Sequence, residues 1–211
     1  DPIPALGMIQ EHSRRILDRF KLPFMVGGEH LVSLGLAKAV YERFPNMHII
    51  QFDAHADLRD DYLGVKYSHA CVMRRCHDFL GDNRIHQFCI RSGERSEFEF
   101  ASQHTKMHKF NFNGIEEMAK ALAISGTPVY LTVDLDCLDS AVLPGTGTPE
   151  AGGVSFNDLL RAILILKDNK VNIVAADVNE LSPMLDQSGA STALTCKLMR
   201  EMLLALSTLR G

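Results

Sequence analysis

The sequence predicts a single α/β domain in which helices cover both faces of a mostly parallel sheet, giving three layers, α/β/α. Two observations predict this fold class. Apolar runs of strand length alternate with helical patterns along the whole chain, and the strand patterns are apolar almost throughout. Such strands are typical of parallel sheets buried on both faces. The 211 residues contain no internal repeat, low-complexity tract or linker, so we expect one domain over residues 1–211.

The elements follow one another in a regular order. A helix is expected where apolar residues recur at helical spacing, and a strand where a short continuous apolar run is bounded by polar or turn-forming residues. The expected helices cover residues 8–20, 31–43, 68–79, 94–104, 114–123, 155–167 and 189–207. The expected strands cover residues 22–26, 47–52, 85–90, 107–111, 128–133 and 171–176, the fourth having the weakest pattern. Ser155 and Asp158 open the sixth helix in a variant of the capping box, with Asp in place of Glu or Gln.

Charge and cysteine content narrow the function classes. The formal charge is −4 and no lysine- or arginine-rich run is present, so nucleic acid is not an expected partner. No apolar stretch approaches the roughly 20 residues of a membrane-spanning helix, and no signal peptide is visible. The five cysteines are scattered without a Cys-x-x-Cys pair, which favours reduced thiols and a cytoplasmic protein. Cys89 and Cys137 lie in or just after strand patterns, so we expect them in the core.

Acidic and histidine side chains gather directly after three of the predicted strands. The segments are Gly-Gly-Glu-His at 27–30, Asp-Ala-His-Ala-Asp at 53–57 and Asp-Leu-Asp at 134–136. The carboxyl ends of parallel strands meet at one edge of the sheet, where ligands bind in α/β proteins. Because side chains two residues apart in an extended chain point the same way, the acidic and histidine side chains of the second segment share one side, as do the acidic pair of the third. The candidate ligands are His30, Asp53, His55, Asp57, Asp134 and Asp136.

Six ligands of this kind indicate two metal ions. Four carboxylates and two imidazoles would be costly to gather unless cations neutralise the negative charge. They are too many for one tetrahedral zinc ion, and oxygen-rich sites suit Mn²⁺ or Mg²⁺, with the imidazoles favouring Mn²⁺. Two ions bridged by carboxylates can lower the pKa of a shared water. Each segment alone is also compatible with turn chemistry or helix capping, whereas the three together at strand ends favour a metal site.

Two further residues are candidates for chemistry outside the ligand set. His69 opens the helix after the second segment, and because imidazole titrates near neutrality it is a candidate proton shuttle. The alternative is a helix-start residue hydrogen-bonded to the backbone. Glu180 follows the last strand, where its carboxylate could hold a cationic substrate or form a surface salt bridge. The Gly- and Pro-rich loop at 143–153 lacks the spacing of a phosphate loop and is expected to form a rigid wall of the site.

These motifs, in this order, resemble those of the ureohydrolase (arginase–agmatinase) family. Besides the three metal segments, the resemblance includes Ser68-His69, the loop Pro144–Gly153 and Asp-Val-Asn-Glu-Leu-Ser-Pro at 177–183, and it spans roughly residues 22–205. It implies an arginase-like fold and a binuclear manganese hydrolase that cleaves a guanidino group to urea and an amine. It also implies a homo-oligomer, either a trimer or a hexamer.

The resemblance also implies a role for each candidate residue. One Mn²⁺ would be held by His30, Asp53, Asp57 and Asp134, and the other by Asp53, His55, Asp134 and Asp136, with Asp53 and Asp134 bridging the two. His69 matches the family's proton-shuttle histidine, and Glu180 matches its guanidinium-binding glutamate. Asp57 would also relay a proton to the leaving amine.

The segment after Asp57 bears on the substrate. Arginases place an Asn shortly after the last Asp of the histidine motif, whereas here the chain continues Leu58-Arg-Asp-Asp-Tyr62, which is more similar to agmatinases. The resemblance therefore implies hydrolysis of agmatine, a small cationic guanidino compound, to putrescine and urea. The Asp-Leu-Arg triplet is also similar to formimidoylglutamate hydrolases, so Arg59 either faces the pocket or pairs with Asp60 or Asp61.

Several alternatives stay open at the level of sequence. The substrate is alternatively guanidinobutyrate, arginine or formimidoylglutamate, and the chain is alternatively a non-catalytic relative of the family. Family members usually carry a further strand and loops before the position of Asp1, so we expect that N-terminal part of the fold to be absent from this chain.

Overall fold

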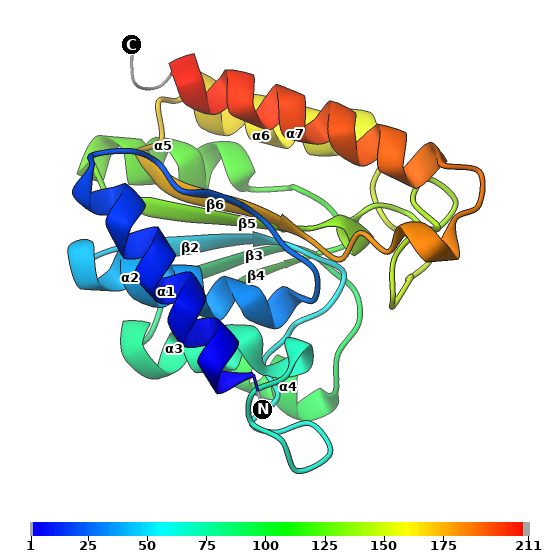
Figure 1. The fold of residues 1–211 in the computed structure, drawn as a ribbon, viewed down its shortest axis with the longest axis horizontal. Coiled ribbons are helices and arrows are strands. Elements are labelled where there is room, and N and C mark those ends of the chain that lie inside the picture. Colours follow the sequence, from blue (N-terminus) through cyan, green and yellow to red (C-terminus); the bar gives the residue numbers. More distant parts are fainter. Residues whose placement is uncertain (1, 209–211) are drawn as a thin grey trace.

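Six parallel strands form one sheet in the computed structural model, which describes residues 2–208 (Figure 1). The strands are β1 (Phe24–Val26), β2 (His48–Phe52), β3 (Ile85–Ile90), β4 (Lys106–Lys109), β5 (Val129–Asp134) and β6 (Ile173–Asn179). Their order across the sheet is β1-β6-β5-β2-β3-β4, and every pairing is parallel. The last strand in the chain thus lies between the first strand and β5.

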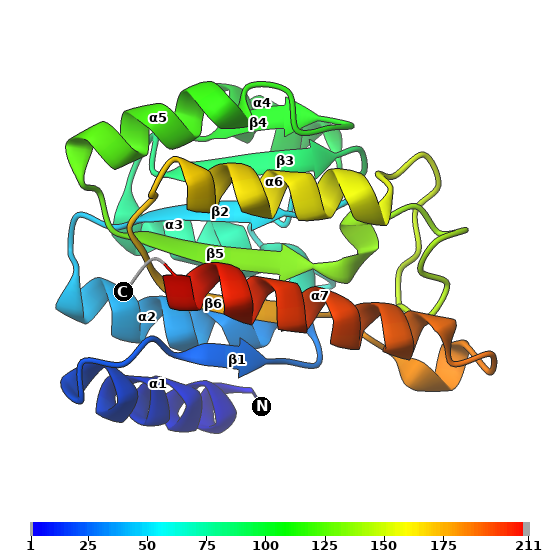
Figure 2. The same ribbon diagram turned by 90° about the horizontal axis from the view of Figure 1, so that it is seen from above.

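Seven α-helices of the described chain cover the two faces of this sheet. They are α1 (Ile3–Asp18), α2 (Ser33–Arg43), α3 (Val72–Leu80), α4 (Arg95–His104), α5 (Ile115–Ser125), α6 (Phe156–Asp168) and α7 (Ala190–Thr208). Helices α1 to α4 lie on one face and α5 to α7 on the other (Figures 1 and 2). This is the three-layer α/β/α arrangement that the sequence predicts.

Two apolar cores fill the space between the layers. Ile50 and Phe52 of β2 belong to the core under α5 to α7, and Ile49 of the same strand belongs to the core under α1 to α4. Because successive side chains of a strand point to opposite faces, one apolar strand supplies both cores. Cys89 and Cys137 are fully buried, as expected from their positions in the sequence.

The predicted elements are all present, with shifted ends. Helix α1 begins at Ile3 rather than at residue 8, since proline is tolerated in a first helical turn and Pro4 occupies one. Strand β6 continues to Asn179, so that Glu180 follows it directly. Two helices are preceded by a turn of 3-10 helix, η1 (His30–Val32) and η2 (His69–Cys71). Ser155 and Asp158 form the expected capping box at the start of α6.

The sheet order decides where functional side chains can meet. Strands β1, β6, β5 and β2 are neighbours, and all four have their carboxyl ends at the same edge. The segments that follow them therefore converge, although they are far apart in sequence. Among residues 2–208, no helix is both long and apolar enough to cross a membrane.

Candidate metal centre

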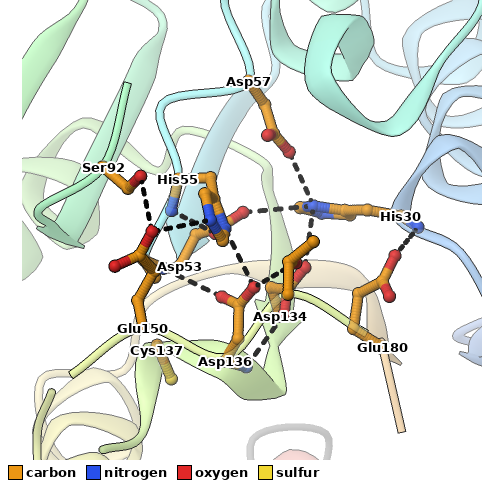
Figure 3. A network of polar contacts seen from close by, with 12 residues as sticks. His30, Asp53, His55, Asp57, Ser92, Asp134, Asp136, Cys137, Glu150 and Glu180 are labelled. Atoms are coloured by element: carbon orange, nitrogen blue, oxygen red, sulfur yellow. Dashed lines mark hydrogen bonds and ion pairs between the residues drawn. The ribbon is translucent and has the colours of Figure 1, made fainter. Parts of the chain in front are cut away.

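His30 lies at the centre of a group of carboxylates from two other strand ends. Its Nδ1 is 2.9 Å from Asp57 Oδ2, 3.1 Å from Asp53 Oδ2 and 3.3 Å from Asp134 Oδ2 (Figure 3). All four residues are buried. One imidazole nitrogen and three carboxylate oxygens thus face a common point.

A second group of the same kind lies beside the first and shares Asp53 with it. His55 Nδ1 is 2.9 Å from Asp136 Oδ2 and 3.7 Å from Asp53 Oδ1 (Figure 3). Asp53 therefore directs one oxygen to each group, as a bridging ligand would. Asp134 contributes Oδ2 to the first group, while its Oδ1 accepts a hydrogen bond from the backbone N–H of Asp136 at 2.9 Å. The structure thus brings all six predicted ligands together.

The pKa values of these residues indicate that the protein atoms alone do not neutralise the negative charge of the site. Burial by itself would lower the pKa of His30, but Asp53 and Asp57 raise it well above its ordinary value. Burial, together with the charge of Asp53, raises the pKa of Asp57 to about 7. Burial and the neighbouring charge of Asp136 raise the pKa of Asp134 well above its usual range. Carboxylates crowded in this way are stabilised in the ionised form by a cation.

The donor set fits divalent metal ions. His30 Nδ1 is buried and has no hydrogen bond of good geometry among the described residues, although three carboxylates surround it. A nitrogen lone pair aimed at such a point is the arrangement of a metal ligand. Four carboxylates and two imidazoles form the mixed oxygen and nitrogen set that suits Mn²⁺.

A hydrogen-bonded chain behind His30 fixes which ring nitrogen faces the centre. Thr132 of β5 donates its hydroxyl hydrogen to the buried Asp177, and its Oγ1 lies 2.9 Å from His30 Nε2. Asp177 also accepts from Ser33 Oγ at 2.7 Å and from the hydroxyl of Tyr130. Since the one hydroxyl hydrogen of Thr132 is used, its oxygen accepts from Nε2–H of His30. When the ring gives up its second proton to a metal ion, Nδ1 carries the free lone pair, as metal binding requires.

The second histidine and the loop after β5 are fixed by residues that the sequence did not suggest. His55 Nε2 lies 3.8 Å from Glu150 Oε1, which accepts from Ser92 Oγ at 2.9 Å (Figure 3). Arg91 donates through its Nη2 to the carbonyls of Asp136, Leu138 and Glu150 at 2.8–3.2 Å. The guanidinium of Arg91 therefore joins the segment that carries Asp136 to the Gly- and Pro-rich loop by hydrogen bonds to both.

Local backbone geometry explains part of the motifs. A Cβ at Gly27 would collide with Asn179 Oδ1, so only glycine lets the chain after β1 pass this close to the end of β6. Asp57 and Glu180 have φ values of 55° and 65°, a left-handed conformation that is uncommon for such residues. Strained residues of this kind concentrate at functional sites.

Glu180 and His69, the two candidate catalytic residues outside the ligand set, both line the pocket beside the two groups of candidate ligands. Glu180 Oε1 accepts a 2.7 Å hydrogen bond from the backbone N–H of His30 (Figure 3), and burial raises the pKa of Glu180. His69 is 41% exposed, and its hydrogen bond with Glu29 raises the pKa of the imidazole. The cavity has a volume of about 200 Å³ and is also lined by Tyr62, Gly93 and Thr148.

Arg59 takes neither of the two partners that the sequence suggested. It lines the pocket, but its guanidinium pairs with Glu94 at 2.9 Å and lies 3.5 Å from Glu97. It also lies over the ring of Tyr62, 5.0 Å from the centroid. Asp60 pairs instead with Arg75. Of the two alternatives that the sequence left open, the structure thus places Arg59 at the pocket and not in a pair with Asp60 or Asp61, because Glu94 and Glu97, distant in sequence, lie closer to it.

Comparisons with known proteins find relatives that match nearly the whole chain. The agmatinase of Bacillus subtilis is 41% identical over 205 residues, which are 97% of this chain and 70% of that protein. The guanidinobutyrase of Pseudomonas aeruginosa is 30% identical over 97% of this chain and 66% of its own length. A crystal structure from Clostridium difficile is 45% identical and superimposes with a TM-score of 0.95, covering 98% of this chain and 75% of that one. The model of the arginase family matches residues 1–205, and the chain belongs to that family.

Proposed function

We propose that this chain hydrolyses the guanidino group of agmatine, giving putrescine and urea, with two Mn²⁺ ions as cofactors. The observation that carries the proposal is the gathering of all six candidate ligands beside a pocket lined by Glu180, in a chain 41% identical to an agmatinase. His30, Asp53, Asp57 and Asp134 would hold one ion, and Asp53, His55, Asp134 and Asp136 the other. When bound, the ions would lower the pKa of a water molecule at the floor of the pocket.

Glu180 is placed to hold the guanidinium group. Its Oε1 is fixed by the backbone N–H of His30, which leaves Oε2 to accept from a guanidinium in a charge-assisted hydrogen bond. Gly147 borders Oε2, since a Cβ built there would stand 3.6 Å from that oxygen. A guanidinium held by Glu180 presents its carbon to the metal groups, an orientation effect that lowers the barrier.

Asp57 and His69 would manage the protons of the reaction. Asp57 lines the pocket beside the candidate ligands, so its carboxylate would take up a proton from the attacking water and pass it to the leaving amine. His69 lines the same pocket and is also 41% exposed, so it can carry protons between the pocket and solvent.

The residues at the rim of the pocket favour agmatine as the substrate over compounds that carry a carboxylate. The charge of Arg59 is offset by Glu94 and Glu97, so this arginine is not free to attract a carboxylate tail. The hydroxyls of Ser92 and Thr148 at the pocket wall are already donated to Glu150 and Asp136, so an α-carboxylate would lose its hydration there and gain few hydrogen bonds. Guanidinobutyrate remains the second candidate, because the guanidinobutyrase relative is 30% identical.

Hydrolysis rates of the Mn²⁺-loaded protein test the proposal. We expect kcat/KM for agmatine to exceed that for arginine by at least ~10²-fold, or roughly 3 kcal/mol. Urea release is measured for agmatine, arginine and guanidinobutyrate, and glutamate release for formimidoylglutamate. Faster turnover of guanidinobutyrate or formimidoylglutamate would overturn the choice of agmatine. No turnover of any of them by protein with two bound ions would indicate a non-catalytic relative.

We also propose that the protein is cytoplasmic and forms a homo-oligomer. A cytoplasmic protein is supported by five free thiols. A homo-oligomer, as a trimer or hexamer, rests on the family resemblance and is tested by light scattering in solution.

A further inference from the structure

Glu29, the third residue of the Gly-Gly-Glu-His segment, contacts His69 rather than the metal groups. Its Oε1 accepts two hydrogen bonds from that residue, one from the backbone N–H at 2.7 Å and one from the ring Nδ1 at 3.0 Å. The two side chains are 49% and 41% exposed. A single carboxylate oxygen therefore holds His69 at both its backbone and its ring.

The position of Glu29 is set by the segment that also carries a metal ligand and orients Glu180. Glu29 has extended backbone, with φ −66° and ψ 141°, and it directly precedes His30. The backbone N–H of His30 donates to Glu180 Oε1, and the backbone N–H of Glu180 donates to the carbonyl of Gly28 at 2.8 Å. Of three consecutive residues, Gly28 thus contacts Glu180, Glu29 contacts His69, and His30 belongs to the first group of candidate ligands. Glu29 makes no side-chain capping bond to the short helix that it precedes. Its bond to the backbone N–H of His69 caps the start of η2, but capping does not account for the second bond of the same oxygen, to the ring Nδ1.

We propose that Glu29 is a positioning residue for His69, and that it fixes both the ring orientation and the tautomer of the proton shuttle. This inference rests on the proposed function. An ionised carboxylate only accepts hydrogen bonds, so Nδ1 of His69 carries the hydrogen in this pair. Nε2 is then the nitrogen that exchanges protons in the pocket.

The ring needs such a restraint because little else holds it. Tyr62 meets it edge to face, with ring centroids 5.5 Å apart, and its surroundings are otherwise open enough to leave it 41% exposed. Exposed side chains change rotamer freely. Without Glu29, the imidazole would spend less time facing the substrate and would populate both tautomers, which lowers the rate of proton transfer while substrate binding is kept.

A double-mutant cycle tests this inference in the Mn²⁺-loaded protein. The variants are Glu29→Ala, Glu29→Gln, His69→Ala and Glu29→Ala combined with His69→Ala. We expect Glu29→Ala to lower kcat for agmatine about tenfold with KM changed less than about twofold, and Glu29→Gln, which keeps an acceptor, to lose less. In the His69→Ala background, Glu29→Ala should change kcat less than about twofold, because no shuttle remains to be positioned. Imidazole in the buffer should restore the single and double His69 variants equally.

The cycle separates this role from a structural one. Glu29 adjoins the ligand His30, so bound Mn²⁺ is measured in every variant, and Glu99→Gln, which removes an exposed carboxylate of α4 paired with Arg95, is the control. A loss of activity that persists at full size in the His69→Ala background would overturn the inference and place the role of Glu29 in the metal loop. An unchanged kcat in Glu29→Ala would also overturn it. If the unsubstituted protein released no urea, the proposed function itself would have failed, which is a different result from either.

Discussion

Replacing Thr132 by valine removes one hydroxyl from the wall behind the metal groups. Thr132 is fully buried on β5, where it accepts from His30 Nε2 at 2.9 Å and donates to Asp177. Valine has nearly the same shape, so the packing of the strand is kept while both hydrogen bonds are lost. We expect Thr132→Val to weaken Mn²⁺ binding although Thr132 is not a ligand.

The magnitude follows from the tautomer that metal binding requires. With a metal on Nδ1, the hydrogen of His30 must sit on Nε2, where the valine variant offers it no acceptor. In the metal-free valine variant the ring can give up its Nε2 proton and keep only the hydrogen on Nδ1, beside the three carboxylates, whereas the metal-bound form cannot avoid the unpaired Nε2–H. A buried donor without a partner costs ~1–3 kcal/mol, which corresponds to about 5- to 150-fold in affinity at ~1.4 kcal/mol per decade.

Calorimetric titration of the metal-stripped protein with Mn²⁺ measures this effect. Thr132→Ser is the matched control, because it keeps the hydroxyl and should bind within about threefold of the unsubstituted protein. Circular dichroism checks that both variants are folded. If folded Thr132→Val bound Mn²⁺ as tightly as Thr132→Ser, the argument that this hydroxyl sets the tautomer of His30 would be wrong.

Three further predictions concern the charges of the site. Asp134→Asn should lose most bound Mn²⁺ and nearly all urea release, and metal analysis showing two ions per chain in that variant would contradict the site. Because burial and a neighbouring carboxylate raise the pKa of metal-free Asp57 to about 7, Mn²⁺ must displace a proton below that pH; its affinity should fall by up to about tenfold per pH unit for each proton displaced. Titrations in buffers of different ionisation enthalpy should show this proton release. Arg59→Ala should change kcat/KM for agmatine less than about threefold, since Glu94 and Glu97 already offset the arginine; a gain of tenfold or more would show that this charge opposes the substrate.

The sequence was informative wherever the signal was local. The six candidate ligands lie on three short segments, each directly after an apolar strand, and the i, i+2 spacing in the second and third segments already places their side chains together. The capping box at Ser155 is a signal of the same kind, since its partner Asp158 is three residues away. The parallel sheet followed from the alternation of elements.

Residues whose role depends on distant partners could not be predicted. Glu29 and Thr132 are ordinary in their local sequence, and their meaning comes from His69 and His30, which other strands bring to the same edge. Arg91 acts on carbonyl groups, which no residue pattern identifies. The insertion of β6 between β1 and β5 was likewise invisible, because the order of strands in a parallel sheet depends on which crossovers pack best rather than on any one strand.

The spread of the ligands along the chain has a consequence for folding. They come from positions between residues 30 and 136 and from the ends of three strands, so an unfolded chain offers no pair of groups in the geometry that captures two ions tightly. The sheet must assemble first and must tolerate the gathered carboxylates in the meantime. His30 and His55 make this possible, because the surrounding carboxylates hold both rings in the protonated form, with the pKa of His55 raised to about 11 in spite of burial. Each imidazolium would thus act as a temporary counter-ion during folding, and metal loading would be a late exchange of protons for the proposed Mn²⁺ ions in a folded protein.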